Sequence, residues 1–123
     1  LKNIFLRHKK HKLAMSNAVK ALNLKLFADE KYLSPSVTAI ETGEMDAEEF
    51  RKTIKNNFDI LLAGGQDHLK GKIFRVGHLG YINDRDIITV ISAISNTLLD
   101  LGKITAEQAG EALVMASRYL EAN

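Results

Sequence analysis

The spacing of apolar residues changes several times along this chain, and the order of the changes restricts the possible folds more than any other feature. Helical spacing, in which apolar residues recur every three or four positions, begins the chain and ends it. Between these segments lie short stretches in which apolar and polar residues alternate, as in half-buried strands. We predict helices over 3–23, from Asp46 to Phe58, from Asn83 or Asp84 to Leu101 and from Thr105 onward, and strands over 24–28, 37–41, 60–63 and 72–76.

This order of elements, α-β-β-α-β-β-α-α, is typical of an α+β fold. We expect one small, mainly antiparallel sheet of three to four strands with helices packed on one face. Asp46 with Glu49 has the spacing of a capping box, and so does Thr105 with Gln108. Gly102 suits the end of the helix before it. The predicted buried stripes of the last three helices are Phe50, Ile54 and Phe58; Ile87, Ile91, Ile94, Leu98 and Leu101; and Ala109, Ala112, Leu113, Ala116 and Leu120.

Length and composition restrict the class of protein. A chain of 123 residues fits one domain with a modest core. It contains no cysteine, which excludes disulfides and thiolate metal sites within it. We find no signal peptide and no apolar run long enough to span a membrane, and we therefore expect a cytoplasmic protein with no membrane partner.

Positive charge is concentrated near the start of the chain. Residues 1–31 hold eight Lys or Arg against two acids, whereas residues 32–123 hold nine against thirteen. The run over 7–12 could bind a phosphate backbone, although a solvated helix face explains it equally simply and is the interpretation we favour. His8 and His11 have spacing suitable for a shared metal, but the surrounding cations oppose one, and we predict no metal site.

The stretch K-I-F-R-V-G-H-L-G holds the most suggestive residue of the chain. It reads as a strand in which Arg75 shares a face with Ile73 and Gly77, while Phe74 and Val76 point to the other face. An arginine held on a rigid strand beside a glycine is a good receptor for a planar carboxylate. Two other interpretations stay open here: an arginine paired with an internal Asp or Glu, or one at the edge of the sheet.

Two glycines follow the preceding strand. Gly64 and Gly65 lack the G-x-G-x-x-G pattern of a phosphate loop, and no helix start follows them. We expect a turn that needs positive φ, or a close approach of the backbone to its surroundings. His78 is interpreted as a packing residue or as one that supports the Arg75 site from behind.

Three motifs in order give the chain a family resemblance. They are S-P-S-V-T-A-I from Ser34, I-L-L-A-G-G-Q from Ile60 and G-K-I-F-R-V-G-H-L-G-Y from Gly71. Together they resemble the C-terminal small domain of class V aminotransferases, pyridoxal-phosphate enzymes of fold type I. The resemblance is greatest to the alanine–glyoxylate and serine–pyruvate branch, which includes proteins labelled as the small subunit of cyanobacterial soluble hydrogenase.

The resemblance implies a division of labour between two domains. The family places the cofactor-binding lysine and the phosphate anchors in a large domain, and none of them matches a position here, so we expect no catalytic or cofactor-binding residue in this chain. The residue that the family takes from the small domain is the arginine that holds the substrate carboxylate, which matches Arg75. Residues 1–23 then correspond to a helix linking the domains and 24–123 to the small domain, with Gly64 and Gly65 near the active-site mouth.

Further expectations follow from the same resemblance. The substrates are an amino acid and a 2-oxo acid, the full-length protein is a homodimer, and the chain alone is inactive. Two alternatives remain: a stand-alone module that senses a carboxylate through Arg75 and the loop 64–71, and a nucleic-acid binder that uses residues 7–12. A lyase or desulfurase parent is also compatible with the motifs.

Overall fold

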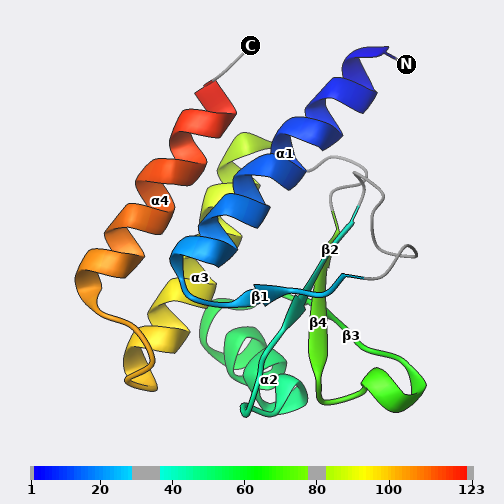
Figure 1. Ribbon diagram of the computed structural model, residues 1–123, viewed down its shortest axis with the longest axis vertical. Helices are drawn as coiled ribbons and strands as arrows, with labels where there is room; N and C mark the ends of the chain where they lie inside the picture. Colours follow the sequence, from blue (N-terminus) through cyan, green and yellow to red (C-terminus); the bar gives the residue numbers. More distant parts are fainter. Residues whose placement is uncertain (1, 29–36, 78–82, 122–123) are drawn as a thin grey trace.

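The structure is a computed structural model that describes residues 2–28, 37–77 and 83–121 (Figure 1). Its elements follow the predicted order, with one added 3-10 helix. They are α1 (Lys2–Ala21), β1 (Lys25–Leu26), β2 (Val37–Glu41), α2 (Ala47–Phe58), β3 (Ala63–Gly64), η2 (Asp67–Leu69), β4 (Ile73–Gly77), α3 (Asp84–Asp100) and α4 (Ala106–Glu121). The predicted α+β class is confirmed. Among the described helices, none has the length and apolar character that crossing a bilayer requires.

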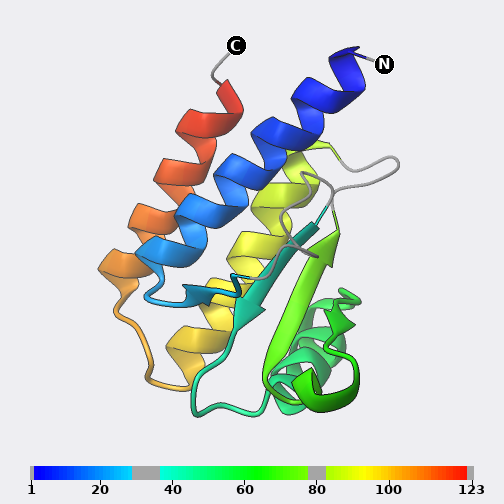
Figure 2. The same cartoon turned by 45° about the vertical axis from the view of Figure 1, so that its right-hand side comes forward.

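The sheet is antiparallel throughout, with strand order β1-β2-β4-β3. Figures 1 and 2 show α1, α3 and α4 gathered on one side of it, with α2 below them. The apolar residues of all these helices share one core with Phe74 and Val76, so the helices cover a single face as predicted. We call the opposite side of the sheet the open face.

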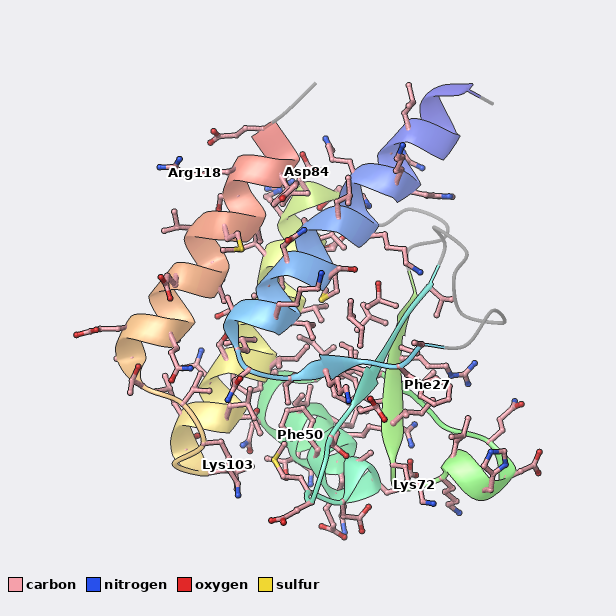
Figure 3. The ribbon with its side chains drawn as sticks, in the orientation of Figure 1. Phe27, Phe50, Lys72, Asp84, Lys103 and Arg118 are labelled. Carbon is pink, nitrogen blue, oxygen red and sulfur yellow. The ribbon has the colours of Figure 1, made fainter. Side chains whose placement is uncertain are left out.

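The main core forms where the inward-facing side chains of the strands pack against the apolar faces of the helices. Phe74 is fully buried, and its ring centroid lies 5.3 Å from that of Phe50. Figure 3 labels Phe50 on α2. Ile40 on β2 and Ile54 on α2 are also fully buried. Burying side chains of this size stabilises the fold by about 1.5–3 kcal/mol each. The core therefore fixes β4, the strand that carries Arg75.

Helices α1 and α4 run side by side in both ribbon views. Alanines on both helices are fully buried in the core: Ala14 and Ala18 on α1, and Ala112 and Ala116 on α4. Small side chains let two helix backbones approach closely. The alanines in the predicted buried stripe of α4 therefore allow α4 to pack closely against α1.

Two residues predicted in the buried stripes are exposed. Phe58 is 39% exposed because it ends α2, immediately before Asp59 turns the chain with φ of 56°. Leu101 is 53% exposed because it lies past the last residue of α3, where Gly102 ends the helix with φ of 70°. In each case the apolar spacing continues to the end of the helix, where the side chain no longer faces the core.

The helix caps agree with the sequence in most details. Thr105 and Gln108 exchange both bonds of the predicted capping box, and Asn83, not Asp84, caps α3. Asp46 caps α2, but its carboxylate accepts from the backbone N–H of Glu48 and not from that of Glu49. Asp46 is thus a cap without the predicted capping-box partner.

The third strand is shorter and later than predicted. It comprises Ala63 and Gly64 instead of residues 60–63. Leu62 is buried in the helix-covered core, and its carbonyl accepts a hydrogen bond from Arg51 on α2 rather than from a neighbouring strand. Helix α2 therefore holds the backbone that precedes β3. The predictions on Ser34, Pro35, His78 and Tyr81 lie outside the described residues.

Candidate functional site

The open face of the sheet has a small apolar cluster of its own. Ala39 of β2 and Ile73 of β4 are buried there, and Phe27, Val37 and Leu69 pack against them. Figure 3 labels Phe27 at this part of the sheet. Leu69 belongs to η2, the 3-10 helix that the sequence analysis missed. The open face is therefore partly covered by short segments instead of by helices.

Arg75 lies on this open face, in the middle of β4. Its side chain is half-buried. Phe74 and Val76 lie in the helix-covered core and Ile73 lies in the cluster on the open face, so the predicted alternation along the strand is confirmed. Strand β4 is an inner strand between β2 and β3, so the sheet-edge interpretation of Arg75 is wrong. Its cross-strand neighbours are Ala39 and Ala63. Two alanines leave lateral room around a large guanidinium.

The backbone of β3 orients the Arg75 side chain. Arg75 Nε donates a hydrogen bond to the Gly64 carbonyl oxygen over 2.9 Å. This contact fixes one edge of the guanidinium plane. A carboxylate that bound two parallel N–H donors would then use the two terminal nitrogens.

Gly64 and Gly65 lie close to their surroundings, which was one of the two predicted reasons for glycine; the neighbours are side-chain ends at Gly64 and backbone atoms at Gly65. A β-carbon on Gly64 would lie 2.6 Å from Glu48 Oε2 and 2.7 Å from Arg51 Nη1. A β-carbon on Gly65 would lie 2.4 Å from the Leu69 carbonyl oxygen. Positive φ occurs instead at other described glycines, Gly71 among them. Gly64 also belongs to β3 and not to the predicted loop 64–71.

An ion pair on α2 lies against β3. Arg51 Nη1 donates to Glu48 Oε1 over 2.7 Å, and Arg51 Nε donates to the Leu62 carbonyl oxygen over 2.9 Å. Glu48 Oε2 is buried and accepts no hydrogen bond from the described residues. The sequence analysis missed this pair, although the i,i+3 spacing of Glu48 and Arg51 was a usable signal.

His11 connects α1 to the start of α3. It is fully buried, and its Nε2 donates to Asp84 Oδ1 over 2.9 Å, while Lys10 Nζ donates to Asp84 Oδ2 over 3.3 Å. Figure 3 labels Asp84 beside α1. Partial burial alone would raise the pKa of Asp84, but the hydrogen bonds from His11 and Lys10 outweigh it and hold this pKa below its ordinary value.

This geometry gives His11 a carboxylate partner on α3. His8 lies on the same helix, and the described residues hold no group of three His, Asp or Glu side chains placed to bind an ion. The sequence analysis treated His11 as part of an exposed basic run and missed its burial. Helical phase places it one turn before Met15 on the core side of α1, which was the available signal.

No described lysine has the surroundings of a cofactor anchor. Lys12 is half-buried, and burial lowers the pKa of its amine. Its Nζ nevertheless donates to the Val37 carbonyl oxygen over 2.6 Å. Lys10 is paired with Asp84. The amines of the described residues therefore do not fit the covalent site that pyridoxal phosphate requires.

Comparison with known proteins gives consistent sequence relatives. The chain is 53% identical over 102 residues to a protein named soluble hydrogenase 42 kDa subunit from Anabaena cylindrica, which covers 83% of the chain. It is 33% identical over 126 residues to the serine–glyoxylate aminotransferase of Methylorubrum extorquens, which covers 100% of the chain. No protein-family model matches the chain.

Solved structures give the same picture. The ureidoglycine–glyoxylate aminotransferase of Bacillus subtilis matches 93% of the chain with a TM-score of 0.81 and 32% identity. The pyridoxamine–pyruvate aminotransferase of Mesorhizobium loti matches 98% of it with a TM-score of 0.86, and at 23% identity this likeness concerns the fold alone. The chain spans 30% and 31% of these two structures, and 27% and 31% of the two sequence relatives.

Proposed function

Because the chain matches the C-terminal small domain of class V aminotransferases in sequence and in fold, we propose that it is the substrate-carboxylate-binding domain of such an enzyme. The reaction moves an amino group between an amino acid and a 2-oxo acid. Both substrates carry a carboxylate beside the reacting carbon. One receptor for that carboxylate therefore serves both halves of the reaction.

The observation that carries the proposal is Arg75 on the open face of the sheet. Its charge is permanent, its strand is fixed by the core on the other face, and its Nε is held by the Gly64 carbonyl. A guanidinium that cannot rotate freely sets both the position and the plane of a bound carboxylate. Such orientation accelerates a reaction by keeping the reacting atoms aligned.

The proposal assigns the cofactor to another part of a longer polypeptide. Pyridoxal phosphate supplies the electron sink for the bond changes at the substrate carbon. The described residues offer it no anchor, because the half-buried Lys12 amine is engaged with Val37 and the other lysines whose side chains are described lie at the surface or in ion pairs. In the proposed enzyme this chain binds and orients the substrate, and it is inactive alone. Residues 1–23 then form the helix that links this domain to the large domain, Gly64 and Gly65 lie near the active-site mouth, and the enzyme is a cytoplasmic homodimer.

The names of the relatives favour a small 2-oxo acid as one substrate. Several of them are aminotransferases whose names include glyoxylate. The hydrogenase name of the Anabaena protein suggests no second function for this chain, which has no cysteine to offer nickel or an iron–sulfur cluster. We therefore propose the aminotransferase role alone.

The test uses the longer polypeptide that the proposal requires, with Arg75→Lys and Arg75→Met as variants. Losing a charge-assisted hydrogen-bonded contact costs about 1.5–3 kcal/mol, so kcat/KM for the amino acid should fall roughly 10- to 150-fold in Arg75→Met. Arg75→Lys keeps the positive charge but not the two parallel N–H donors, so its kcat/KM should lie between that of the wild type and that of Arg75→Met. Lys72→Met, an exposed cation just before β4, is the control. Normal turnover in Arg75→Met would refute the proposal.

A further inference from the structure

A continuous set of contacts leads from α2 to the Arg75 guanidinium. Glu48 holds Arg51, Arg51 holds the Leu62 carbonyl, and two residues later the Gly64 carbonyl holds Arg75 Nε. All of these atoms lie on described residues, and every donor–acceptor distance in the set is between 2.7 and 2.9 Å. The set joins the helix-covered side of the domain to its open face.

We infer that Glu48 and Arg51 are positioning residues for Arg75. They hold the Leu62–Gly64 backbone so that the Gly64 carbonyl fixes the guanidinium in the plane needed to receive a substrate carboxylate. This inference rests on the proposed function. It assigns a role to two side chains that touch neither the substrate nor Arg75 itself.

Strand β3 needs such a support because it is weakly held by the sheet. It has only two residues and lies at the edge, so it pairs on one side alone. Short edge strands contribute few ladder hydrogen bonds of their own. The Leu62 side chain, one residue before β3 begins, is buried in the core, and Arg51 adds a hydrogen bond from its Nε–H to the Leu62 carbonyl oxygen. A directional bond of this kind sets the rotation of the strand as well as its distance from α2.

The Glu48–Arg51 pair is itself closely confined. The two side chains are 31% and 25% exposed, and the i,i+3 bond of 2.7 Å aims the guanidinium at Leu62. Gly64 has no side chain that could displace them, since a β-carbon there would lie within 2.7 Å of both Glu48 Oε2 and Arg51 Nη1. The same glycine thus presents its carbonyl to Arg75 and leaves space for the pair that holds it.

If this inference holds, removing the Arg51 side chain on α2 should weaken substrate binding only by disturbing the orientation of Arg75. Arg51→Met removes the donor to the Leu62 carbonyl oxygen and the ion pair with Glu48, and methionine is a good helix former at this position. A guanidinium that has lost its fixed plane binds a carboxylate less well, and one lost hydrogen bond corresponds to about a 3- to 10-fold change in an equilibrium constant. We expect KM for the amino acid to rise by that factor, with kcat changed less than twofold.

A double-mutant cycle separates positioning from general damage. Arg51→Met, Arg75→Met and the double variant are compared in the longer polypeptide. Because Arg51 is inferred to act only through Arg75, its substitution should change KM less than twofold when Arg75 is already Met. An effect of Arg51→Met that is equally large in both backgrounds would overturn the inference while leaving the proposed function intact. Lys52→Met, an exposed cation on the same helix, is the control and should leave KM unchanged.

A second measurement needs no catalysis. In the 123-residue chain, the Arg75 Nε–H proton should exchange slowly with solvent, and Arg51→Met should accelerate this exchange at least threefold, as read by side-chain NMR. Glu48→Gln tests the same point if Arg51→Met does not fold. Equal exchange in the wild type and in both variants would refute the positioning role. Accelerated exchange together with a normal KM in Arg75→Met would instead reject the proposed function.

Discussion

Substituting Gly65 with alanine gives the sharpest test of how the open face is assembled. Gly65 immediately follows β3, and the backbone of η2 lies against it. A β-carbon at this position would be 2.4 Å from the Leu69 carbonyl oxygen, 2.7 Å from the Leu69 carbonyl carbon and 2.9 Å from Ile73 Cγ1. Two of these three atoms are backbone, so no side-chain rotation relieves the overlap.

The magnitude follows from what must move. Ordinary contacts of a β-carbon begin near 3.4 Å, so η2 would have to retreat by roughly 1 Å. Overpacking of this kind costs about 1–3 kcal/mol, partly offset by the about 0.4–1 kcal/mol that alanine gains by restricting the unfolded chain. We therefore expect a net loss of about 1–2 kcal/mol in the free energy of unfolding, or roughly 3–10 °C in Tm for a domain of this size.

The assay is urea unfolding of the 123-residue chain, followed by circular dichroism. The matched control is Gly110→Ala on α4, where a β-carbon would meet nothing within 4 Å. Because Gly110 lies within a helix, alanine there should stabilise the chain by about 0.5–1 kcal/mol. The two variants should move the midpoint in opposite directions with unchanged slopes. A Gly65→Ala chain as stable as the wild type would show that η2 does not lie against Gly65.

The remaining predictions concern charge, packing and the cofactor. Because the folded-state pKa of Asp84 is lowered, its contribution to stability is present above the ordinary aspartate pKa of 3.8 and is lost as pH falls through the folded value. Asp84→Asn should therefore remove up to about 1 kcal/mol of unfolding free energy at pH 7 and progressively less as pH falls below 3.8, measured by urea unfolding. A difference that does not change with pH would contradict this. Ile54→Ala should cost about 2–5 kcal/mol of unfolding free energy because Ile54 is fully buried, whereas Phe58→Ala should cost about 1 kcal/mol or less because Phe58 is 39% exposed. Equal losses would refute the packing described here. The chain mixed with pyridoxal phosphate and borohydride should show no single lysine modified stoichiometrically by mass spectrometry, and one such lysine would contradict the absence of a cofactor site.

Much of the fold could be predicted because local patterns determined it. The alternation of Ile73, Phe74, Arg75 and Val76 gave the face on which Arg75 lies, before any contact was known. Helix caps such as Thr105 depend on residues three positions away, and they too were readable. In each case the information lies within one or two turns of chain.

The features that were missed depend on contacts between distant segments. The apolar pattern of residues 60–63 does not indicate that Arg51 will donate a hydrogen bond to the Leu62 carbonyl oxygen, or that the strand will begin only at Ala63. The partner of His11, Asp84, is 73 positions away in the sequence, so the phase of α1 could indicate the burial of His11 but not its hydrogen bond. The support of Arg75 by Gly64 likewise joins two strands, so a sequence pattern could identify the arginine but not what holds it.

The central claim is that Arg75 receives the substrate carboxylate, and a crystal structure of the longer polypeptide with a bound 2-oxo acid tests it most directly. The account predicts carboxylate oxygens about 2.7–3.1 Å from the two terminal nitrogens of Arg75, with Nε still donating to the Gly64 carbonyl. A carboxylate held by other residues, with Arg75 turned away from it, would contradict the account.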